Sequence, residues 1–214
     1  LTQSNIKTNT LRRKIACIKV FYNYLKYQHI IEENPFNQLR FQFRTEKILP
    51  KTIPYDILKN IFSYLEQRVV ISKTDYQKQK AERNLLIISL LLSTGIRISE
   101  LCHIHLKDIN LSNKTLHIIG KGKKERILFL GDQTTFNLLE TYINKNGKES
   151  NDFLFPGKHS PKPLSEQSVR LILKRIVEQN GLSKTITPHM FRHSFATMLL
   201  DSDVDIRYIQ QILG

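Results

Sequence analysis

The 214-residue chain carries 33 Lys and Arg against 19 Asp and Glu, which gives a formal net charge of +14 and a pI near 9.8. Such an excess attracts polyanions and favours a DNA or RNA partner, although a merely basic surface is an alternative. With 40% hydrophobic residues the chain can bury a core. Its longest apolar run, Leu85–Leu92, is too short to span a membrane and indicates a buried helix. We therefore expect one domain and part of a second, and no membrane partner.

The two cysteines, Cys17 and Cys102, lie far apart in the sequence, and both fall in helical patterns. They are predicted to be small core residues of a reduced, cytosolic protein, rather than a disulfide or a metal site. The chain begins with Leu1 and ends at Gly214 within a helical pattern, so we expect it to be a fragment.

The first 50 residues predict a basic helical segment followed by a linker. Apolar residues recur at spacings of four and three from Leu11 to Leu25, which is typical of one helix stripe. These 50 residues contain nine Lys and Arg and three acids. One helix cannot bury its own stripe, so partner helices are expected before Leu1. Residues 40–51 are polar and lie next to proline, which predicts an interdomain linker.

Further helices are predicted from residue 52 onward. The first starts at Thr52-Ile53-Pro54, and a buried helix then runs to Leu92. Gly95 permits the left-handed turn that ends this helix, and Arg97 opens a short helix that carries Glu100. Apolar runs at 116–119 and 126–130 surround a glycine-rich centre and predict a β-hairpin.

Two more helices follow the hairpin, one from Gly131-Asp132 to about Asn144 and one capped by Ser165 and ended by Asn180-Gly181. The fold class predicted from these patterns is mainly α with a small antiparallel β-sheet.

The segment 187–197 predicts a helix in which Thr187 caps the N-terminus and Pro188 takes the first position. Phe191, Phe195 and Met198 fall on one side, which is expected to face the core. The opposite side carries three side chains that suit an anion: His189, Arg192 and His193. An Arg and a His one turn apart can bind one phosphate together. Taken alone, the pair is better explained as an exposed helix face.

Three segments occur in a fixed order: Thr94–Leu101 (TGIRISEL), Gly120–Arg126 (GKGKKER) and Thr187–Thr197 (TPHMFRHSFAT). Each alone is explained by an ordinary helix start, a solvated basic turn or an exposed helix face. Together, in a strongly basic chain, they closely resemble the tyrosine recombinase (phage integrase) family from about residue 49 to 214. Residues 1–48 resemble, more weakly, the end of the family's helical core-binding domain. The resemblance therefore implies a partial DNA-binding domain and linker in 1–48, and a catalytic domain in 49–214.

The resemblance also implies a role for each motif residue. Displacement at a DNA phosphodiester builds negative charge on the non-bridging oxygens, which preformed cations stabilise. Arg97 and Arg192 match the two arginines that clamp the scissile phosphate, and Lys121 matches the lysine that protonates the departing 5′ oxygen. His189 matches the histidine that acts as an acid or base or positions the phosphate. Two residues are expected to support this site from behind: Glu100 and His193. Backbone contacts to DNA are expected from basic residues of the hairpin and the first helix: Lys123, Lys124, Arg126, Arg12, Arg13 and Lys14.

The sequence departs from the family at the nucleophile. In the family a His or Trp and then the nucleophilic tyrosine follow an Ile-Leu-Gly ending, which stands here at residues 212–214. The nucleophile is therefore expected beyond Gly214. Tyr208 precedes this ending on a helix that the family uses for packing, so it is not expected to attack. We expect this chain to bind DNA without forming a 3′-phosphotyrosyl link.

The resemblance implies a site-specific recombinase that cuts and rejoins DNA strands by transesterification without a metal, nucleotide or other cofactor. Its implied partners are double-stranded DNA and three further copies of itself, as a tetramer on two DNA sites, and its implied location is cytoplasmic, in a bacterium or encoded by a phage or mobile element. Integration or excision of a mobile element is favoured over Xer-like chromosome dimer resolution because the class spreads readily. A type IB topoisomerase, which has a similar pocket, and a non-catalytic DNA-binding module are the alternatives.

Overall fold

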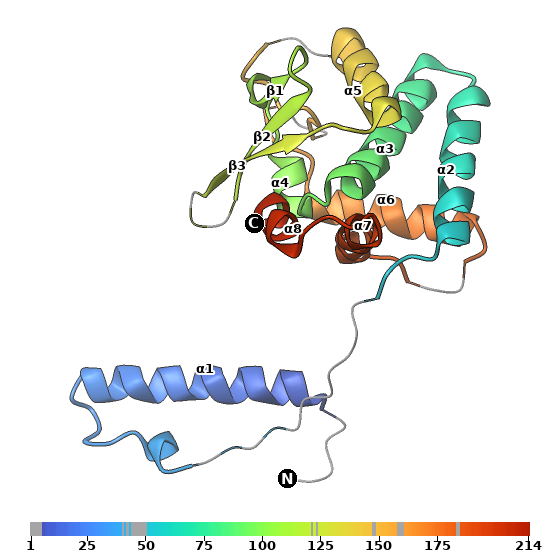
Figure 1. The fold of residues 1–214 in the computed structure, drawn as a ribbon. Coiled ribbons are helices and arrows are strands. Elements are labelled where there is room, and N and C mark those ends of the chain that lie inside the picture. Colours follow the sequence, from blue (N-terminus) through green and yellow to red (C-terminus); the bar gives the residue numbers. More distant parts are fainter. Residues whose placement is uncertain are drawn as a thin grey trace. The chain divides into compact units, whose positions relative to one another are not determined.

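The computed structural model describes residues 6–39, 41, 43, 51–120, 122, 124–146, 149–157, 161–182 and 185–214. The chain divides into two compact units, Leu1–Leu49 and Pro50–Gly214 (Figure 1). The domain boundary predicted after residue 48 lies among residues outside the described ranges.

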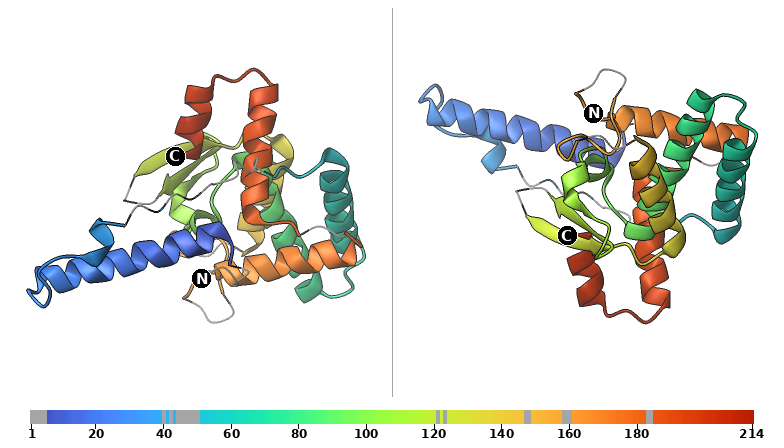
Figure 2. Two further views of the ribbon diagram at one scale, coloured as in Figure 1. Left: turned by 90° about the horizontal axis from the view of Figure 1, so that it is seen from below. Right: turned by 90° about the horizontal axis from the view of Figure 1, so that it is seen from above.

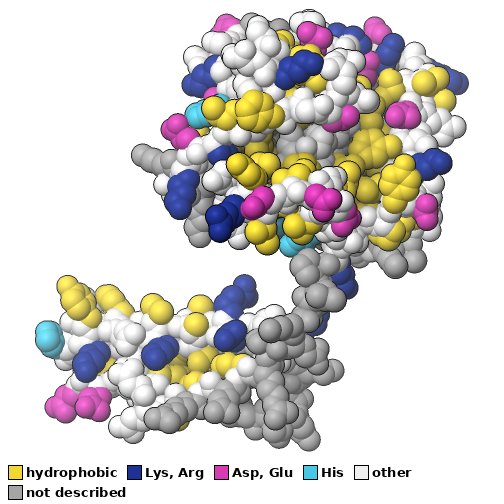
Figure 3. All heavy atoms as spheres, in the orientation of Figure 1, with side chains coloured by type: hydrophobic (Ala, Val, Ile, Leu, Met, Phe, Trp, Pro, Cys, Tyr) yellow, Lys and Arg dark blue, Asp and Glu magenta, His cyan; other side chains and the backbone are white. Residues whose placement is uncertain are grey.

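The first unit consists of a long helix, α1 (Thr8–Tyr27), and a short 3-10 helix, η1 (Pro35–Asn37). The Asn34 side chain begins η1 by accepting a hydrogen bond from the Phe36 N–H at 2.8 Å. No residue of α1 is buried, and the unit exposes hydrophobic side chains between its Lys and Arg side chains (Figure 3). Cys17, which was predicted to be a core residue, is therefore exposed.

The second unit confirms the predicted fold class of mainly α with a small antiparallel sheet. Its described helices and strands are α2 (Tyr55–Val70), α3 (Asp75–Thr94), α4 (Ile98–Cys102), η2 (Leu106–Asp108), β1 (Ile109–Asn110), β2 (Thr115–Ile119), β3 (Glu125–Phe129), α5 (Gln133–Asn146), α6 (Glu166–Gln179), α7 (Pro188–Asp201) and α8 (Ile206–Leu213). The sheet has the order β1-β2-β3 with both pairs antiparallel, and Ile118 lies opposite Arg126. Among the described elements, no helix is both long and apolar enough to cross a membrane.

Helix α3 runs through the core of this unit and contacts α2, α5 and α7 (Figures 1 and 2). Its second half is buried on all sides, and Leu86, Ile87, Ile88 and Leu91 have no exposed surface. Packing against several neighbours explains why the run 85–92 is almost continuously apolar rather than amphipathic. Cys102, the second predicted core cysteine, is buried.

Helix α3 ends as predicted at Gly95, whose φ of +59° lies in the left-handed region. A Cβ atom here would lie 2.4 Å from Phe195 Cδ1 and 3.0 Å from Leu213 Cδ2. Glycine therefore serves both the turn and the close approach of α7 and α8. The turn places Arg97 at the start of α4.

Helix α7 starts with Pro188 in its first turn, as predicted, but the Thr187 side chain makes no capping hydrogen bond. Its buried side includes Phe191 and Ser194, whose Oγ accepts a hydrogen bond from the Ile53 N–H at 2.8 Å. The prediction that Met198 faces the core was wrong, since Met198 is 50% exposed. A turn connects α7 to α8, and the two helices stand side by side (Figure 2).

Candidate active site

Glu100 on α4 is the centre of a cluster of charged side chains. Its side chain is only 5% exposed. Oε2 accepts a hydrogen bond from the Arg97 backbone N–H at 3.0 Å, and Oε1 accepts one from Arg97 Nη1 at 3.0 Å. Arg126 on β3 adds a bidentate pair, Nη1 to Oε1 at 3.0 Å and Nη2 to Oε2 at 2.7 Å. One carboxylate therefore holds two guanidiniums that come from different elements.

The pKa of Glu100 lies below its ordinary value. Burial alone would raise this pKa, but the hydrogen bonds from Arg126 and Arg97 outweigh the effect of burial. Glu100 is therefore a carboxylate at neutral pH and acts only as an acceptor towards both arginines.

Arg192 on α7 brings a third guanidinium to the same place. Its Nη1 donates to the Gly95 carbonyl at 2.9 Å, and its Nη2 donates to the Leu213 carbonyl at 2.5 Å. Burial and, next, the positive charge of Arg97 lower the pKa of Arg192 to about 10. Arg192 therefore stays charged at neutral pH, and the cluster has more positive than negative charge around it.

The three arginines converge on the last turn of α8. Arg126 Nε donates to the carbonyl of residue 212 at 2.9 Å, Arg192 to that of residue 213, and Arg97 Nη2 to that of Gly214 at 2.6 Å. The carbonyl end of a helix carries partial negative charge, which attracts cations. The Arg97 side chain is 35% exposed, so an anion from solvent can reach it. The arrangement suits a phosphate held by two planar forks of donors.

The two histidines predicted for the site lie on the same helix as Arg192. His189 is in the first turn of α7, one turn before Arg192, and is exposed. It lines a pocket together with Ile98 on α4 and Pro188. His193 is also exposed. Within the described part of the chain, neither imidazole makes a side-chain hydrogen bond, so the cluster itself consists of arginines and Glu100.

The predicted catalytic lysine, Lys121, and its neighbour Lys123 lie outside the described residues. Gly120, which precedes Lys121, is described, and its N–H donates to the Lys124 carbonyl at 2.7 Å. A Cβ atom on Gly120 would lie 3.4 Å from both Arg126 Nη1 and Glu100 Oε1. The hairpin segment that contains Lys121 therefore starts directly beside the arginine cluster.

The predicted DNA contacts divide into exposed residues and one buried residue. Lys124 is exposed, and so are three consecutive residues on α1: Arg12, Arg13 and Lys14. Arg126 differs from these residues, because its side chain is only 11% exposed and its guanidinium is bonded to Glu100. The strand pattern held the signal for this: on β3, Arg126 and Leu128 point inward while the residues on either side of them are exposed.

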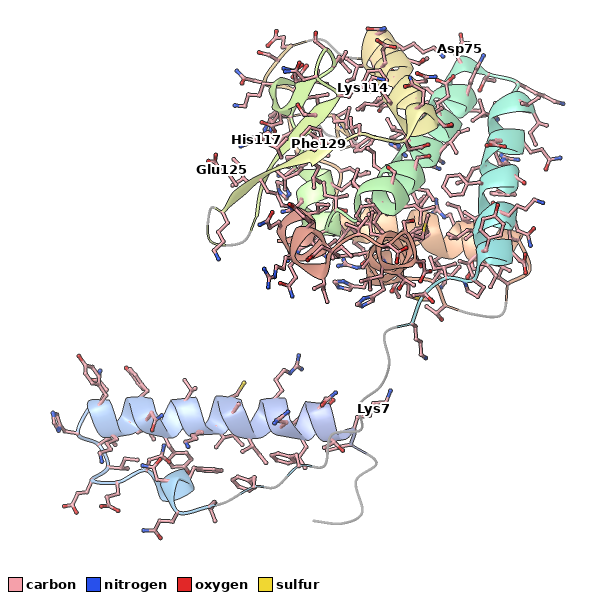
Figure 4. All side chains as sticks on the ribbon, viewed as in Figure 1. Lys7, Asp75, Lys114, His117, Glu125 and Phe129 are labelled. Atoms are coloured by element: carbon pink, nitrogen blue, oxygen red, sulfur yellow. The ribbon has the colours of Figure 1, made fainter. Side chains whose placement is uncertain are left out.

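The outer face of the sheet carries a different set of side chains. His117 on β2 lies beside Glu125 on β3, with Nε2 3.2 Å from Oε2 (Figure 4). Phe129 on the same face is 75% exposed. Tyr208, which is not expected to be the nucleophile, lies on α8 and is 63% exposed.

The chain is similar to a known protein family over most of its length. The model of the phage integrase family matches residues 61–214. A tyrosine recombinase of Agathobacter rectalis is 49% identical over 212 residues, which are 97% of this chain and 68% of that protein. The tyrosine recombinase XerC of Bacillus subtilis is 32% identical over 219 residues, which cover 99% of this chain and 68% of that protein. This chain thus spans about two thirds of the length of these relatives.

Solved structures share the fold. The XerH recombinase bound to its difH substrate, in a pre-cleavage complex, superimposes with a TM-score of 0.76 at 24% identity over 100% of this chain and 60% of that chain. The integrase of the Tn1549 transposon, in complex with transposon right end DNA, gives a TM-score of 0.73 at 22% identity over 98% of this chain and 72% of that chain. With the family model matching most of its length and a recombinase of A. rectalis identical at about half of its positions, this chain belongs to the phage integrase family of tyrosine recombinases.

Proposed function

We propose that this chain binds and activates the DNA phosphate in a site-specific recombinase that cuts and rejoins strands through a 3′-phosphotyrosyl intermediate. The observation that carries the proposal is the convergence of Arg97 and Arg192, from α4 and α7, on neighbouring carbonyls of one helix end. Two guanidiniums held this close, with Glu100 paired to Arg97, form a site for one anion of tetrahedral shape. Structures of DNA-bound XerH and Tn1549 integrase, which share the fold, support DNA as the anion.

In this proposal the two arginines donate to the non-bridging oxygens of the scissile phosphate and stabilise the charge that develops there. The phosphate oxygens replace the backbone carbonyls that now accept hydrogen bonds from these two arginines. Lys121 gives a proton to the departing 5′ oxygen, because an alkoxide is far more basic than an amine. His189, one turn before Arg192, assists with proton transfer or holds the phosphate.

The attacking tyrosine in this proposal belongs to a segment after Gly214. Tyr208 is not assigned the role, because it precedes the end of α8 on an exposed face. Incubation of the 214-residue chain with an intact DNA site should therefore yield no covalent protein–DNA adduct. A Tyr208-dependent adduct, detected by denaturing electrophoresis, would overturn this assignment.

For the cellular role we propose integration or excision of a mobile element by a tetramer that brings two DNA sites together. The similarity to the Tn1549 transposon integrase is consistent with this role. Xer-like chromosome dimer resolution is the second candidate, and relatives named tyrosine recombinase XerC, 32% identical in B. subtilis, favour it.

The strand-joining half of the reaction tests the phosphate site without any tyrosine of the protein. A DNA strand that ends in a 3′-p-nitrophenyl phosphate imitates the phosphotyrosyl intermediate. The 5′-hydroxyl of a second strand attacks phosphorus, the bond from phosphorus to the aryl oxygen breaks, and p-nitrophenolate leaves with the electron pair. The proton of the 5′-hydroxyl passes to a base of the protein or to water. Absorbance of nitrophenolate and the length of the joined strand report the rate.

The chain should join this DNA, and Arg97→Ala or Arg192→Ala should reduce the rate about 10²- to 10³-fold, as expected for the loss of one preorganised donor group. Arg170→Ala, which removes an arginine of an exposed ion pair on α6, is the control and should leave the rate unchanged. DNA binding that persists in all variants without joining would favour the non-catalytic module. Relaxation of supercoiled DNA by the complete protein, without strand transfer between duplexes, would favour the topoisomerase alternative.

A further inference from the structure

The geometry points to Arg126 on β3 as a positioning residue of the phosphate site: it sets the orientation of Arg97 through Glu100 and joins the hairpin to α4 and α8. The inference rests on the proposed function, and it assigns Arg126 a role other than the DNA contact that the sequence predicted. Arg126 is separated from Arg97 in the sequence, yet both guanidiniums bind the same carboxylate.

Arg126 uses three of its donors on two partners. Nη1 and Nη2 donate to the two oxygens of Glu100, and Nε donates to the carbonyl of Ile212. Both charged partners are almost fully buried, with side chains 11% and 5% exposed. A buried, bidentate pair has one geometry, unlike the exposed ion pairs on α6, which are free to rearrange.

The carboxylate transmits this geometry to Arg97. Oε1 of Glu100 accepts from Arg126 Nη1 and from Arg97 Nη1, each at 3.0 Å. If Arg126 is removed, Glu100 keeps a single guanidinium partner and can turn towards it. Apart from Glu100, the Arg97 guanidinium is held among the described residues by the Gly214 carbonyl, and its side chain is 35% exposed. When a phosphate replaces that carbonyl as acceptor, the outer nitrogen would depend on Glu100 for its position and would shift without Arg126.

Arg126 also lies beside Gly120, the residue that precedes Lys121. Its partner on the neighbouring strand β2 is Ile118. Its Nη1 lies 3.4 Å from the position that a Cβ on Gly120 would occupy. Gly120 directly precedes Lys121 in the sequence. A single side chain therefore lies next to the start of the hairpin turn and binds both the α4 carboxylate and the end of α8.

Arg126→Lys is the sharpest test, because it keeps the positive charge beside Glu100 but cannot supply two parallel bonds together with a third to Ile212. The matched control is Arg170→Lys, since Arg170 pairs with Glu166 on the exposed face of α6 at 2.7 Å. Both variants are compared with the unchanged chain in the nitrophenyl joining assay, with DNA affinity and thermal unfolding measured in parallel.

At saturating protein, Arg126→Lys should join roughly 10- to 100-fold more slowly, as expected for a reacting group displaced by up to about 1 Å. Its DNA affinity should change by no more than about twofold, and Arg170→Lys should match the unchanged chain in both properties. If Arg126 served only the stability of the fold, Arg126→Lys would have a smaller folded fraction. Excess protein would then supply enough folded chain to restore the rate.

Three outcomes are distinguishable. A slow rate that persists at saturation supports the positioning role. If the unchanged chain joins the DNA and Arg126→Lys joins it at the same rate, the positioning role is overturned and the proposed function stands. An unchanged chain that fails to join the DNA overturns the proposed function, and the role of Arg126 in it falls as well.

Discussion

Glu100 determines how the arginine cluster is arranged at the scale of single residues. Its carboxylate is buried, and two guanidiniums and one backbone N–H donate to it. Breaking such a pair by removing one partner leaves the other charge buried without compensation, which is more costly than losing an exposed ion pair. Glu100 therefore contributes to stability as well as to the orientation of Arg97.

The pH dependence of unfolding tests this assignment. The pKa of Glu100 in the folded chain lies below the ordinary value of 4.5. The carboxylate therefore stabilises the fold above the ordinary pKa, and that contribution is lost as the pH falls towards the lower, folded pKa. In Glu100→Gln, the decrease in melting temperature over this acidic interval should be smaller than in the unchanged chain.

The control for that experiment is Glu166→Gln, which removes a carboxylate from an exposed pair with Arg170. Its melting temperature should decrease with pH as that of the unchanged chain does. Equal acid dependence in Glu100→Gln and the unchanged chain would mean that the buried pairs do not lower the pKa of Glu100.

The sequence predicted some residues of the cluster better than others. Arg97, Glu100 and Arg192 could be predicted because each lies in a motif at a helix start or on a helix face. Arg126 was predicted as a DNA contact, whereas the alternation of its strand turns Arg126 and Leu128 inward and its guanidinium binds Glu100. The carbonyls of α8 that the arginines bind could not be predicted, since backbone acceptors leave no trace in residue type.

Gly95 matters at the scale of the elements, because it lets α3, α4, α7 and α8 approach one another. In Gly95→Ala the positive φ alone should cost about 1–2 kcal/mol. The new Cβ would in addition lie 2.4 Å from Phe195. The free energy of unfolding, measured by denaturant titration, should fall by more than the φ cost alone.

Two other glycines separate the cost of the positive φ from the cost of the steric clash in Gly95→Ala. Gly181 also has a positive φ, +62°, but no atom lies within 4 Å of a Cβ there, so Gly181→Ala should show only the cost of about 1–2 kcal/mol. Gly131 has open space and no positive φ, so Gly131→Ala should be close to neutral. A Gly95→Ala variant no less stable than Gly181→Ala would contradict the close packing of α7 against this turn.

Sequence patterns predicted the longer elements and the short helix α4 but missed the shortest strand. The buried run of α3 and the hairpin strands β2 and β3 are visible as apolar runs of sufficient length. Strand β1 has two residues, too few for any alternation to be seen. The expected cap at Thr187 is absent: Pro188 takes the first turn of α7 as predicted, but the Thr187 side chain makes no capping hydrogen bond.

At the scale of the whole molecule, the charge of +14 predicts that DNA affinity falls steeply with salt. Changing Arg12, Arg13 and Lys14 together to Ala should reduce the slope of log affinity against log salt by about 3 if each contacts one phosphate. Lys145→Ala is the control, because that ammonium already pairs with Glu82 at 2.7 Å. A salt slope near zero for the unchanged chain would count against DNA as the ligand.

The order of the three motifs predicted that distant segments meet at one site, and the described structure brings Arg97 and Arg192 together as expected. Sequence order contains no information on which backbone groups complete the site. The end of α8 takes this place, next to all three arginines, and its position depends on the packing of α7 against α3 and of α8 against α7 and β3.

The most direct measurement of the central claim compares two joining substrates, one with the ordinary 3′-p-nitrophenyl phosphate and one with a methylphosphonate that lacks one charged oxygen. If Arg97 and Arg192 act by stabilising charge on the non-bridging oxygens, Arg97→Ala and Arg192→Ala should slow joining about 10²-fold or more on the phosphate and far less on the neutral methylphosphonate. Equal losses on the two substrates would contradict a clamp of both guanidiniums on one phosphate.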